Sequence, residues 1–282
     1  MSTNGNSEGK PAFLKQLPPL PQIALKVLQL LRYEDSETKS LVELLQSDPA
    51  FSAELLRYAN SPLFGLVNEV KTMRSTVVIL GRERLRAVTM TVAMNSLLSS
   101  PVKSSIFQRV WQHSLATAML TRGLAAVCDD HSPEEAYTAG LLHDVGKFAF
   151  LTLKPKEYPE LLRTEWATPL NCLEKEQAVF GLDHCQAGRW MLEEWKLPPE
   201  MVDAALCHHD EPVAMPFSAV KLVNLGCRLA TALGFDTLKT RCDMDVEGVT
   251  SQLPEEYATG FHPDAELIKE AISSKLLAVT QS

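Results

Sequence analysis

The sequence predicts an all-α protein made of many helices in two lobes. Apolar residues recur at three- and four-residue spacing along most of the chain, which is the period of an amphipathic helix. No stretch shows the strand–helix–strand order of a parallel sheet, and no repeat of fixed period is present. We therefore expect helices to exceed half of the chain, well above the usual share of about one third.

The first lobe is expected to follow a disordered tail, residues 1–12, which is rich in Ser, Asn and Gly. Asp48-Pro49 offers both a capping side chain and a first-turn proline for one of its helices. Gly81 is expected to end one helix before the next begins. The predicted helices of this lobe cover residues 21–31, 41–45, 49–60, 72–80 and 85–98.

The second lobe is expected to begin after Ser99-Ser100-Pro101, where small and helix-breaking residues separate two long helical patterns. Ser132-Pro133-Glu134-Glu135 forms a capping box that opens a helix running into His143. A more polar C-terminal extension, residues 236–282, carries one further helix after residue 264. The predicted helices of the second lobe cover residues 105–127, 132–143, two segments between 155 and 181, 183–195, 200–209 and 217–233.

The composition is that of an ordinary globular protein with 45% hydrophobic residues. Its 35 acidic and 27 basic residues give a net charge of −8, which disfavours binding to a phosphate backbone. The six cysteines form no CxxC pair and are expected to be reduced thiols. The N-terminus has no apolar targeting segment, and no run approaches the roughly 18 apolar residues of a membrane helix. We expect a cytoplasmic protein with neither DNA nor membrane partners.

His143 and Asp144 stand side by side in the apolar stretch 140–147. Two interpretations are open: a buried hydrogen bond at a helix end, or two ligands of one metal ion. Five of the seven histidines lie near helix ends or inside helices of the second lobe, and bundle cores assemble metal sites from inward side chains of several helices. Imidazole and carboxylate together suit a divalent transition metal such as iron, manganese, zinc or nickel. The histidines that favour a metal site are His113, His143, His184, His208 and His209.

Two groups of residues resemble known families. The second lobe, through its ordered histidines and the His143-Asp144 doublet, resembles the HD superfamily of metal-dependent phosphohydrolases. The first lobe is similar to the HDOD (HD-related output domain) family of bacterial signalling proteins, through Ser47-Asp48-Pro49-Ala50, Leu55-Leu56-Arg57, Ala59-Asn60-Ser61 and Val78-Ile79-Leu80-Gly81. The resemblance covers residues 13–235, with a helical lobe at 13–100 and an HD-like lobe at 101–235.

The resemblance also implies a set of ligands. In HD enzymes one metal is held by a histidine, the His-Asp doublet and a later aspartate, whose place is taken here by Asn224. An uncharged amide oxygen there would hold an ion more weakly. Three later histidines match the ligands of a second metal in the HD-GYP branch, which cleaves cyclic di-GMP. The metal ligands that the resemblance implies are His113, His143, Asp144, His184, His208, His209 and Asn224.

Two departures from the HD-GYP pattern argue against its activity. Residues 210–216, directly after the His208-His209 pair, contain no Gly-Tyr-Pro element, so the loop that engages the dinucleotide is missing. Arg109 stands four residues before His113 in place of a glutamate, so a third metal has no ligand there.

These features predict a bacterial regulatory module that contacts signalling proteins, with an HD-like site that holds metal or is vestigial. The alternative is a metal-dependent phosphohydrolase acting on a nucleotide or phosphoester, with Asp144 as a catalytic residue and a metal-activated hydroxide as nucleophile. Lys147 would then neutralise a phosphate oxygen, although it suits a solvent-exposed position near a helix C-terminus equally well. Asp183 is expected to cap the helix that begins at His184 rather than to orient that histidine. No small-molecule ligand is identified by the sequence.

Overall fold

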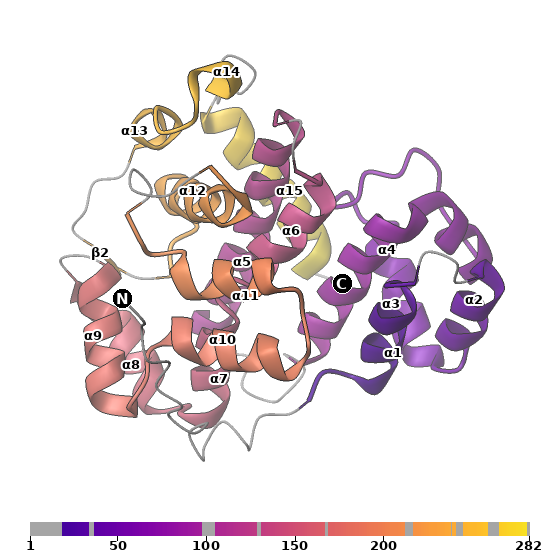
Figure 1. Ribbon diagram of the computed structural model, residues 1–282, viewed down its shortest axis with the longest axis horizontal. Coiled ribbons are helices and arrows are strands. Elements are labelled where there is room, and N and C mark those ends of the chain that lie inside the picture. Colours follow the sequence, from indigo (N-terminus) through magenta and orange to yellow (C-terminus); the bar gives the residue numbers. More distant parts are fainter. Residues whose placement is uncertain are drawn as a thin grey trace, which may run out of the picture.

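The computed structural model describes residues 19–33, 37–97, 105–128, 131–166, 169–211, 217–237, 239–240, 245–258 and 265–280. The predicted tail at 1–12 and the predicted joint at Ser99-Ser100-Pro101 lie outside these residues. Helices make up well over half of the described residues, which confirms the all-α class (Figure 1). The described strands, β1 (Glu165–Trp166) and β2 (Lys239–Thr240), form one short parallel pair.

Four helices form the first lobe, residues 19–97. Asp48 accepts a hydrogen bond from the backbone N–H of Phe51 at 3.0 Å, so the predicted cap is present. Gly81 takes a positive φ of 67° and interrupts a longer helix by a kink, where the sequence suggested two separate helices. A left-handed φ favours glycine because it has no Cβ. The four helices are α1 (Gln22–Leu30), α2 (Thr38–Gln46), α3 (Pro49–Ala59) and α4 (Met73–Leu97).

Eight helices form the second lobe, residues 105–237, around a long central helix, α5. That helix packs against α6 and α12, while α10 packs against α7 and α11 (Figure 1). Ser132 caps α6 by accepting from the backbone N–H of Glu135, as the capping box predicts. The eight helices are α5 (Ser105–Ala126), α6 (Pro133–Leu142), α7 (Val145–Leu153), α8 (Glu157–Arg163), α9 (Pro169–Phe180), α10 (His184–Glu194), α11 (Pro199–Cys207) and α12 (Ala219–Ala232).

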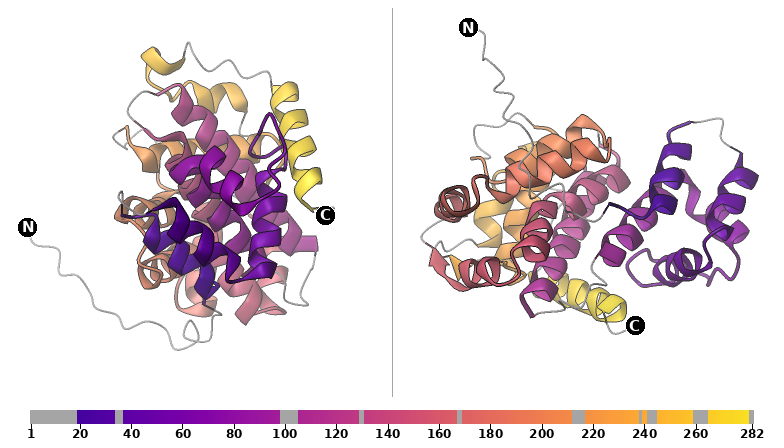
Figure 2. Two further views of the ribbon diagram at one scale, coloured as in Figure 1. Left: turned by 90° about the vertical axis from the view of Figure 1, so that its right-hand side faces the viewer. Right: turned by 90° about the horizontal axis from the view of Figure 1, so that it is seen from below.

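The two lobes stand beside each other and meet where α4 packs against α6 (Figure 2). Buried polar contacts lie at this junction: the hydroxyls of Thr91 and Tyr137 are 3.1 Å apart. Arg122 from α5 lies over the ring of Tyr137 and donates to the carbonyl of Leu63. Buried hydrogen bonds of this kind fix the lobes in one orientation more sharply than apolar contact alone.

The C-terminal extension packs on the second lobe. It contains α13 (Val246–Thr250), α14 (Glu255–Ala258) and α15 (Ala265–Thr280). Contacts join α13 to α12 and α15 to α5, and Ile272 is buried. None of the described helices combines the length and the apolar character needed to cross a bilayer. All cysteines among the described residues are free thiols, as predicted.

Gly146 sets the distance between α7 and α10. A Cβ at this position would lie 1.9 Å from the carbonyl oxygen of His184 and 2.7 Å from the backbone nitrogen of Gly188. Both are backbone atoms, so neither can rotate out of the way. The absence of a side chain at Gly146 therefore allows the two helices to approach closely enough to bring Asp144 beside His184.

We expect Gly146→Ala to lower the free energy of unfolding by about 3 kcal/mol or more, because overpacking of this kind must be relieved by backbone movement. Gly188→Ala, on the facing helix, is the matched control, since its nearest contact would be an ordinary 3.4 Å. There the better helix propensity of alanine should stabilise by about 1 kcal/mol. Denaturant unfolding of both variants measures the difference, and equal stabilities would contradict the close approach.

Candidate metal centre

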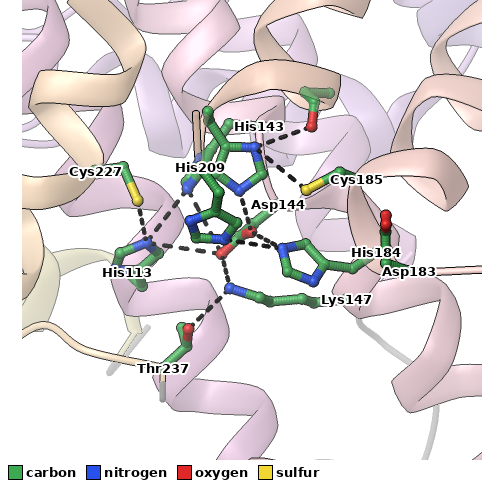
Figure 3. A network of polar contacts seen from close by, with 12 residues as sticks. His113, His143, Asp144, Lys147, Asp183, His184, Cys185, His209, Cys227 and Thr237 are labelled. Carbon is green, nitrogen blue, oxygen red and sulfur yellow. Dashed lines mark hydrogen bonds and ion pairs between the residues drawn. The ribbon is translucent and has the colours of Figure 1, made fainter. Parts of the chain in front are cut away.

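Helix ends bring most of the predicted ligands to one place. His143 and Asp144 form the turn between α6 and α7, and His184 is the first residue of α10. His208 caps the end of α11 and His209 follows it. The sixth predicted ligand, His113, faces them from the middle of α5 (Figure 3).

Each of four rings is held by a hydrogen bond from Nδ1. The acceptors are the carbonyl oxygens of Phe235, Gly140 and Ala205 and the carboxylate of Glu176, at 2.6–2.9 Å. Carbonyl and carboxylate oxygens only accept, so Nδ1 carries the proton and the neutral ring presents a lone pair on Nε2. The four rings held in this way are His113, His143, His208 and His184.

Burial keeps most of these rings neutral. It lowers the pKa of His113 to about 4 even though the carboxylate of Asp144 acts in the opposite direction. The pKa values of His143 and His209 fall well below the usual range for the same reason, with neighbouring histidines and Lys147 adding to the effect. The pKa of His208 is also lowered by burial. Neutral imidazole is the form that binds a metal.

Two groups of donor atoms meet at the two oxygens of Asp144. In the first donor set, Nε2 of His113, Nε2 of His143 and Oδ2 of Asp144 are separated by 3.3, 3.5 and 3.6 Å. In the second donor set, Nε2 of His184 lies 3.2 Å from Nε2 of His209. Oδ1 of Asp144 lies 3.4 Å from Nε2 of His184 and 3.3 Å from Nε2 of His208. Asp144 is thus the one side chain shared by both sets.

The donor sets fit cations. Nε2 of His113 lies beside Nε2 of His143, and both atoms are acceptors, so this short contact cannot be a hydrogen bond between neutral rings. Oδ1 of Asp144 and Nε2 of His208 are buried and have no hydrogen-bond partner. A tetrahedral ion with metal–nitrogen distances of about 2.0–2.1 Å separates its ligand atoms by about 3.3 Å, close to the separations found here. The residues can therefore hold metal. His113 and His143 of the first set, and His184, His208 and His209 of the second, belong to groups whose ligand atoms lie within 4.8 Å of one another.

Lys147 neutralises Asp144 from within the protein. Its side chain is 1% exposed, and Nζ donates to Oδ2 of Asp144 at 2.7 Å and to Oγ1 of Thr237 at 2.9 Å. Burial opposes both charges, yet their attraction raises the pKa of Lys147 and holds that of Asp144 well below its usual value. The expectation of a solvent-exposed lysine near a helix C-terminus is wrong, because Lys147 lies in the first turn of α7. Its ammonium is already committed to Asp144 rather than free for a phosphate.

Asn224 does not enter the cluster. Its amide nitrogen donates to the carbonyl oxygens of His208 and Asp210, and its Oδ1 accepts from Nε of Arg228 at 3.1 Å. The amide oxygen that would have bound an ion thus faces a cation. Asn224 therefore holds the turn that carries His208 in place. It is not the metal ligand that the resemblance had implied. Asp183 caps α10 through the backbone N–H of Gln186, as predicted.

Three residues of the site were missed from the sequence. Glu176 on α9 accepts from both Nδ1 and the backbone N–H of His184, and from the hydroxyl of Tyr158. It is fully buried, and its position midway between Cys172 and Phe180 on one helix face was a signal that a carboxylate points inward. The other two are Thr237, described above, and Cys227, whose Sγ lies 3.5 Å from Nε2 of His113. Burial, with the nearby charge of Asp144, raises the pKa of the Cys227 thiol to about 12.

A family model described as the HDOD domain matches residues 17–211. The chain belongs to the HDOD family. This confirms the resemblance inferred from the sequence. An uncharacterized protein of Treponema pallidum (strain Nichols) is 24% identical over 204 residues, which are 71% of this chain and 39% of that protein. The chain therefore spans less than half the length of this curated relative.

Solved structures share the fold of this HDOD chain. A candidate phosphohydrolase of Shewanella amazonensis SB2B is 22% identical and superposes with a TM-score of 0.70, covering 95% of both chains. An HDOD domain protein of unknown function from Geobacter sulfurreducens is 24% identical, with a TM-score of 0.66 and coverage of 94% and 92%. A candidate signal transduction protein of Marinobacter aquaeolei VT8 is 21% identical, with a TM-score of 0.70 over 95% of this chain and 60% of its own. At these identities the likeness shows the fold.

We expect Lys147→Met to destabilise the metal-free HDOD protein by about 3–5 kcal/mol, because it leaves the buried Asp144 carboxylate without its partner. The exposed Lys156 is the control, and Lys156→Met should change stability by less than about 0.5 kcal/mol. Unfolding in the presence of a chelator measures both. Adding a divalent ion should recover part of the loss in Lys147→Met, since a cation at Asp144 replaces the ammonium. Equal stability of the two variants would contradict the role of Lys147.

Proposed function

We propose that this chain is a bacterial regulatory module that acts by contacting signalling proteins, and that its HD-like cluster holds divalent transition metal as part of the folded state. His113, His143 and Asp144 would bind one ion and Asp144, His184, His208 and His209 a second. Such ions would place positive charge between the buried lone pairs. They would also link helices α5, α10 and α11 to the turn between α6 and α7.

The burial of the ligands carries this proposal. His113, His143, Asp144, His184 and His208 are each 0–2% exposed. A hydrolytic metal keeps an open position and must admit its substrate, whereas structural sites are enclosed by protein ligands. Lys147, which was a candidate to neutralise a phosphate in the hydrolytic alternative, is engaged by Asp144 and Thr237.

Exposed apolar side chains support contact with a partner through the first lobe. Val67 is 96% exposed, and Val78 and Ile79 on α4 are 63% and 53% exposed. Tyr33, three residues after the end of α1, is also exposed. Contiguous exposed apolar surface marks sites of protein–protein contact, and four of the seven exposed large apolar side chains among the described residues lie in this lobe, with Val78 and Ile79 adjacent in the chain.

Phosphoester hydrolysis remains the second candidate, and one feature favours it. His209 is partly exposed, so the second donor set is the one nearer to solvent. Two of the structural neighbours are described as candidate phosphohydrolases, one of them metal-dependent. If this candidate holds, substrate would have to reach an ion at His209.

We expect the purified protein, after reconstitution with zinc, iron, manganese or nickel, to retain at least one equivalent of metal by elemental analysis. A free-ion concentration about 100 times Kd should stabilise the fold by about 2.7 kcal/mol, and a chelator should remove this gain. His143→Ala should abolish the chelator effect, because it removes a ligand. His131→Ala, which alters a histidine outside the cluster that packs against the ring of Phe217, is the control and should keep it. Sub-stoichiometric metal with no chelator effect would contradict the proposal.

A panel of nucleotides and phosphoesters separates the two candidates. The regulatory proposal expects no multiple turnover from metal-loaded protein. Sustained hydrolysis that disappears in His143→Ala and survives in His131→Ala would instead establish the phosphohydrolase.

A further inference from the structure

Cys227 occupies the open side of the first donor set. It lies on α12, one turn after Asn224, and its side chain is buried. Asn224 turns toward Arg228 and the backbone after α11, whereas Sγ of Cys227 points at Nε2 of His113 (Figure 3). Helix α12 therefore delivers a thiol, and not an amide, to the histidines.

The separations fit a thiolate ligand. Zinc binds nitrogen at about 2.0–2.1 Å and sulfur at about 2.3 Å, so tetrahedral geometry places a bound sulfur about 3.5–3.6 Å from a bound nitrogen. Sγ of Cys227 lies 3.5 Å from Nε2 of His113. Ligand atoms of His113, His143 and Cys227 all lie within 4.8 Å of one another. Oδ2 of Asp144 lies 3.6 Å from Nε2 of His113 and 3.5 Å from Nε2 of His143, so it would add an oxygen to these two nitrogens and one sulfur.

We propose that Cys227 binds metal directly as the fourth ligand of the first donor set, which makes this a closed site for a thiophilic ion such as zinc. This inference rests on the metal centre proposed above. On binding, the ion displaces the thiol proton to solvent, and the thiolate adds a negative charge beside the Asp144 carboxylate, whose own charge is shared with Lys147. Four protein ligands leave this ion no position for substrate.

Cys185 is the natural comparison within the same cluster. Its Sγ lies 4.0 Å from His208, on the side of Nδ1, which already donates to the carbonyl of Ala205. Sγ of Cys185 also lies within 4.8 Å of ligand atoms of His184 and His209, but it approaches His208 from the side away from the Nε2 lone pair. We therefore expect nitrogen and oxygen alone to bind an ion at the second donor set, and the two sites to differ in their preference for sulfur-binding ions.

Cobalt(II) replaces zinc and reports sulfur ligation by a thiolate-to-metal charge-transfer band in the near ultraviolet. We expect the band in the wild-type protein and in Cys185→Ser, and its loss in Cys227→Ser and Cys227→Ala. In competition with a chelating indicator, Cys227→Ser should weaken zinc binding at the first donor set by at least about tenfold. Removing a residue that only hydrogen-bonds to a metal ligand already costs about that much, and the loss of a ligand itself should cost no less. Manganese, which has little affinity for sulfur, should bind nearly as before.

The outcomes separate this inference from the proposed function. If wild-type protein takes up no cobalt, both fail. If it takes up cobalt and loses it in His143→Ala, but shows no charge-transfer band, the metal centre stands and the role of Cys227 is refuted. The same holds if the band persists in Cys227→Ser or is lost in Cys185→Ser. Circular dichroism checks that the variants are folded, and the wild-type and Cys185→Ser spectra alone decide the question if the Cys227 variants are not.

Discussion

The carboxylate of Asp144 is the interaction on which the arrangement of the second lobe depends. It is fully buried at the start of α7, where an aspartate ordinarily caps the helix, yet it makes no capping hydrogen bond. Its oxygens instead face histidines from α5, α10 and the end of α11. The cost of burying this charge is offset by the ammonium of Lys147 and by the positive end of the α7 dipole. The glycine at position 146 then lets α10 approach that helix end.

Around this carboxylate the outer nitrogen atoms of the rings are hydrogen-bonded, whereas Oδ1 of Asp144 and Nε2 of His208 on the inner side have no hydrogen-bond partner. The Nδ1 atoms of four rings have acceptors, while their Nε2 atoms point at one another and at Asp144. In a low-dielectric interior, facing lone pairs repel and unpaired acceptors are costly. A packed core normally avoids such an arrangement, and a cation at each oxygen of Asp144 would convert it into a set of favourable contacts. The outer hydrogen bonds therefore orient the ring nitrogens as ligands for a cation would be oriented.

Most of the helices could be predicted from the sequence because their signals are local. Asp48, Ser132 and Asp183 cap the helices that their positions suggested, and the histidines lie together as their order implied. The residues that were misassigned depend on tertiary packing instead. Positions 224 and 227 of α12 are one turn apart, so periodicity cannot decide which of them faces the histidines. The turn after α11 decides it, since its carbonyl oxygens capture the amide of Asn224. In the same way, the sequence around Lys147 does not reveal that its side chain is buried, because the burial depends on contact with Thr237, which lies 90 residues later in the chain.

The position of α11 links the cluster to the junction between the lobes. Its nine residues end at the histidine pair, and its first turn begins beside a cavity of about 100 Å³ lined by both lobes. Met201 from α11 and Leu28 and Met90 from the first lobe line this cavity. Arg32 of the first lobe also hydrogen-bonds to the backbone of Lys196, just before α11. If the proposed ions are bound, this short helix is held at one end by metal ligands and near the other by a lobe contact, so a change at one end would carry a cost at the other. The proposed metal centre and the junction between the lobes would then share one structural element, which a regulatory role requires if the state of one site is to bias the contacts of the other.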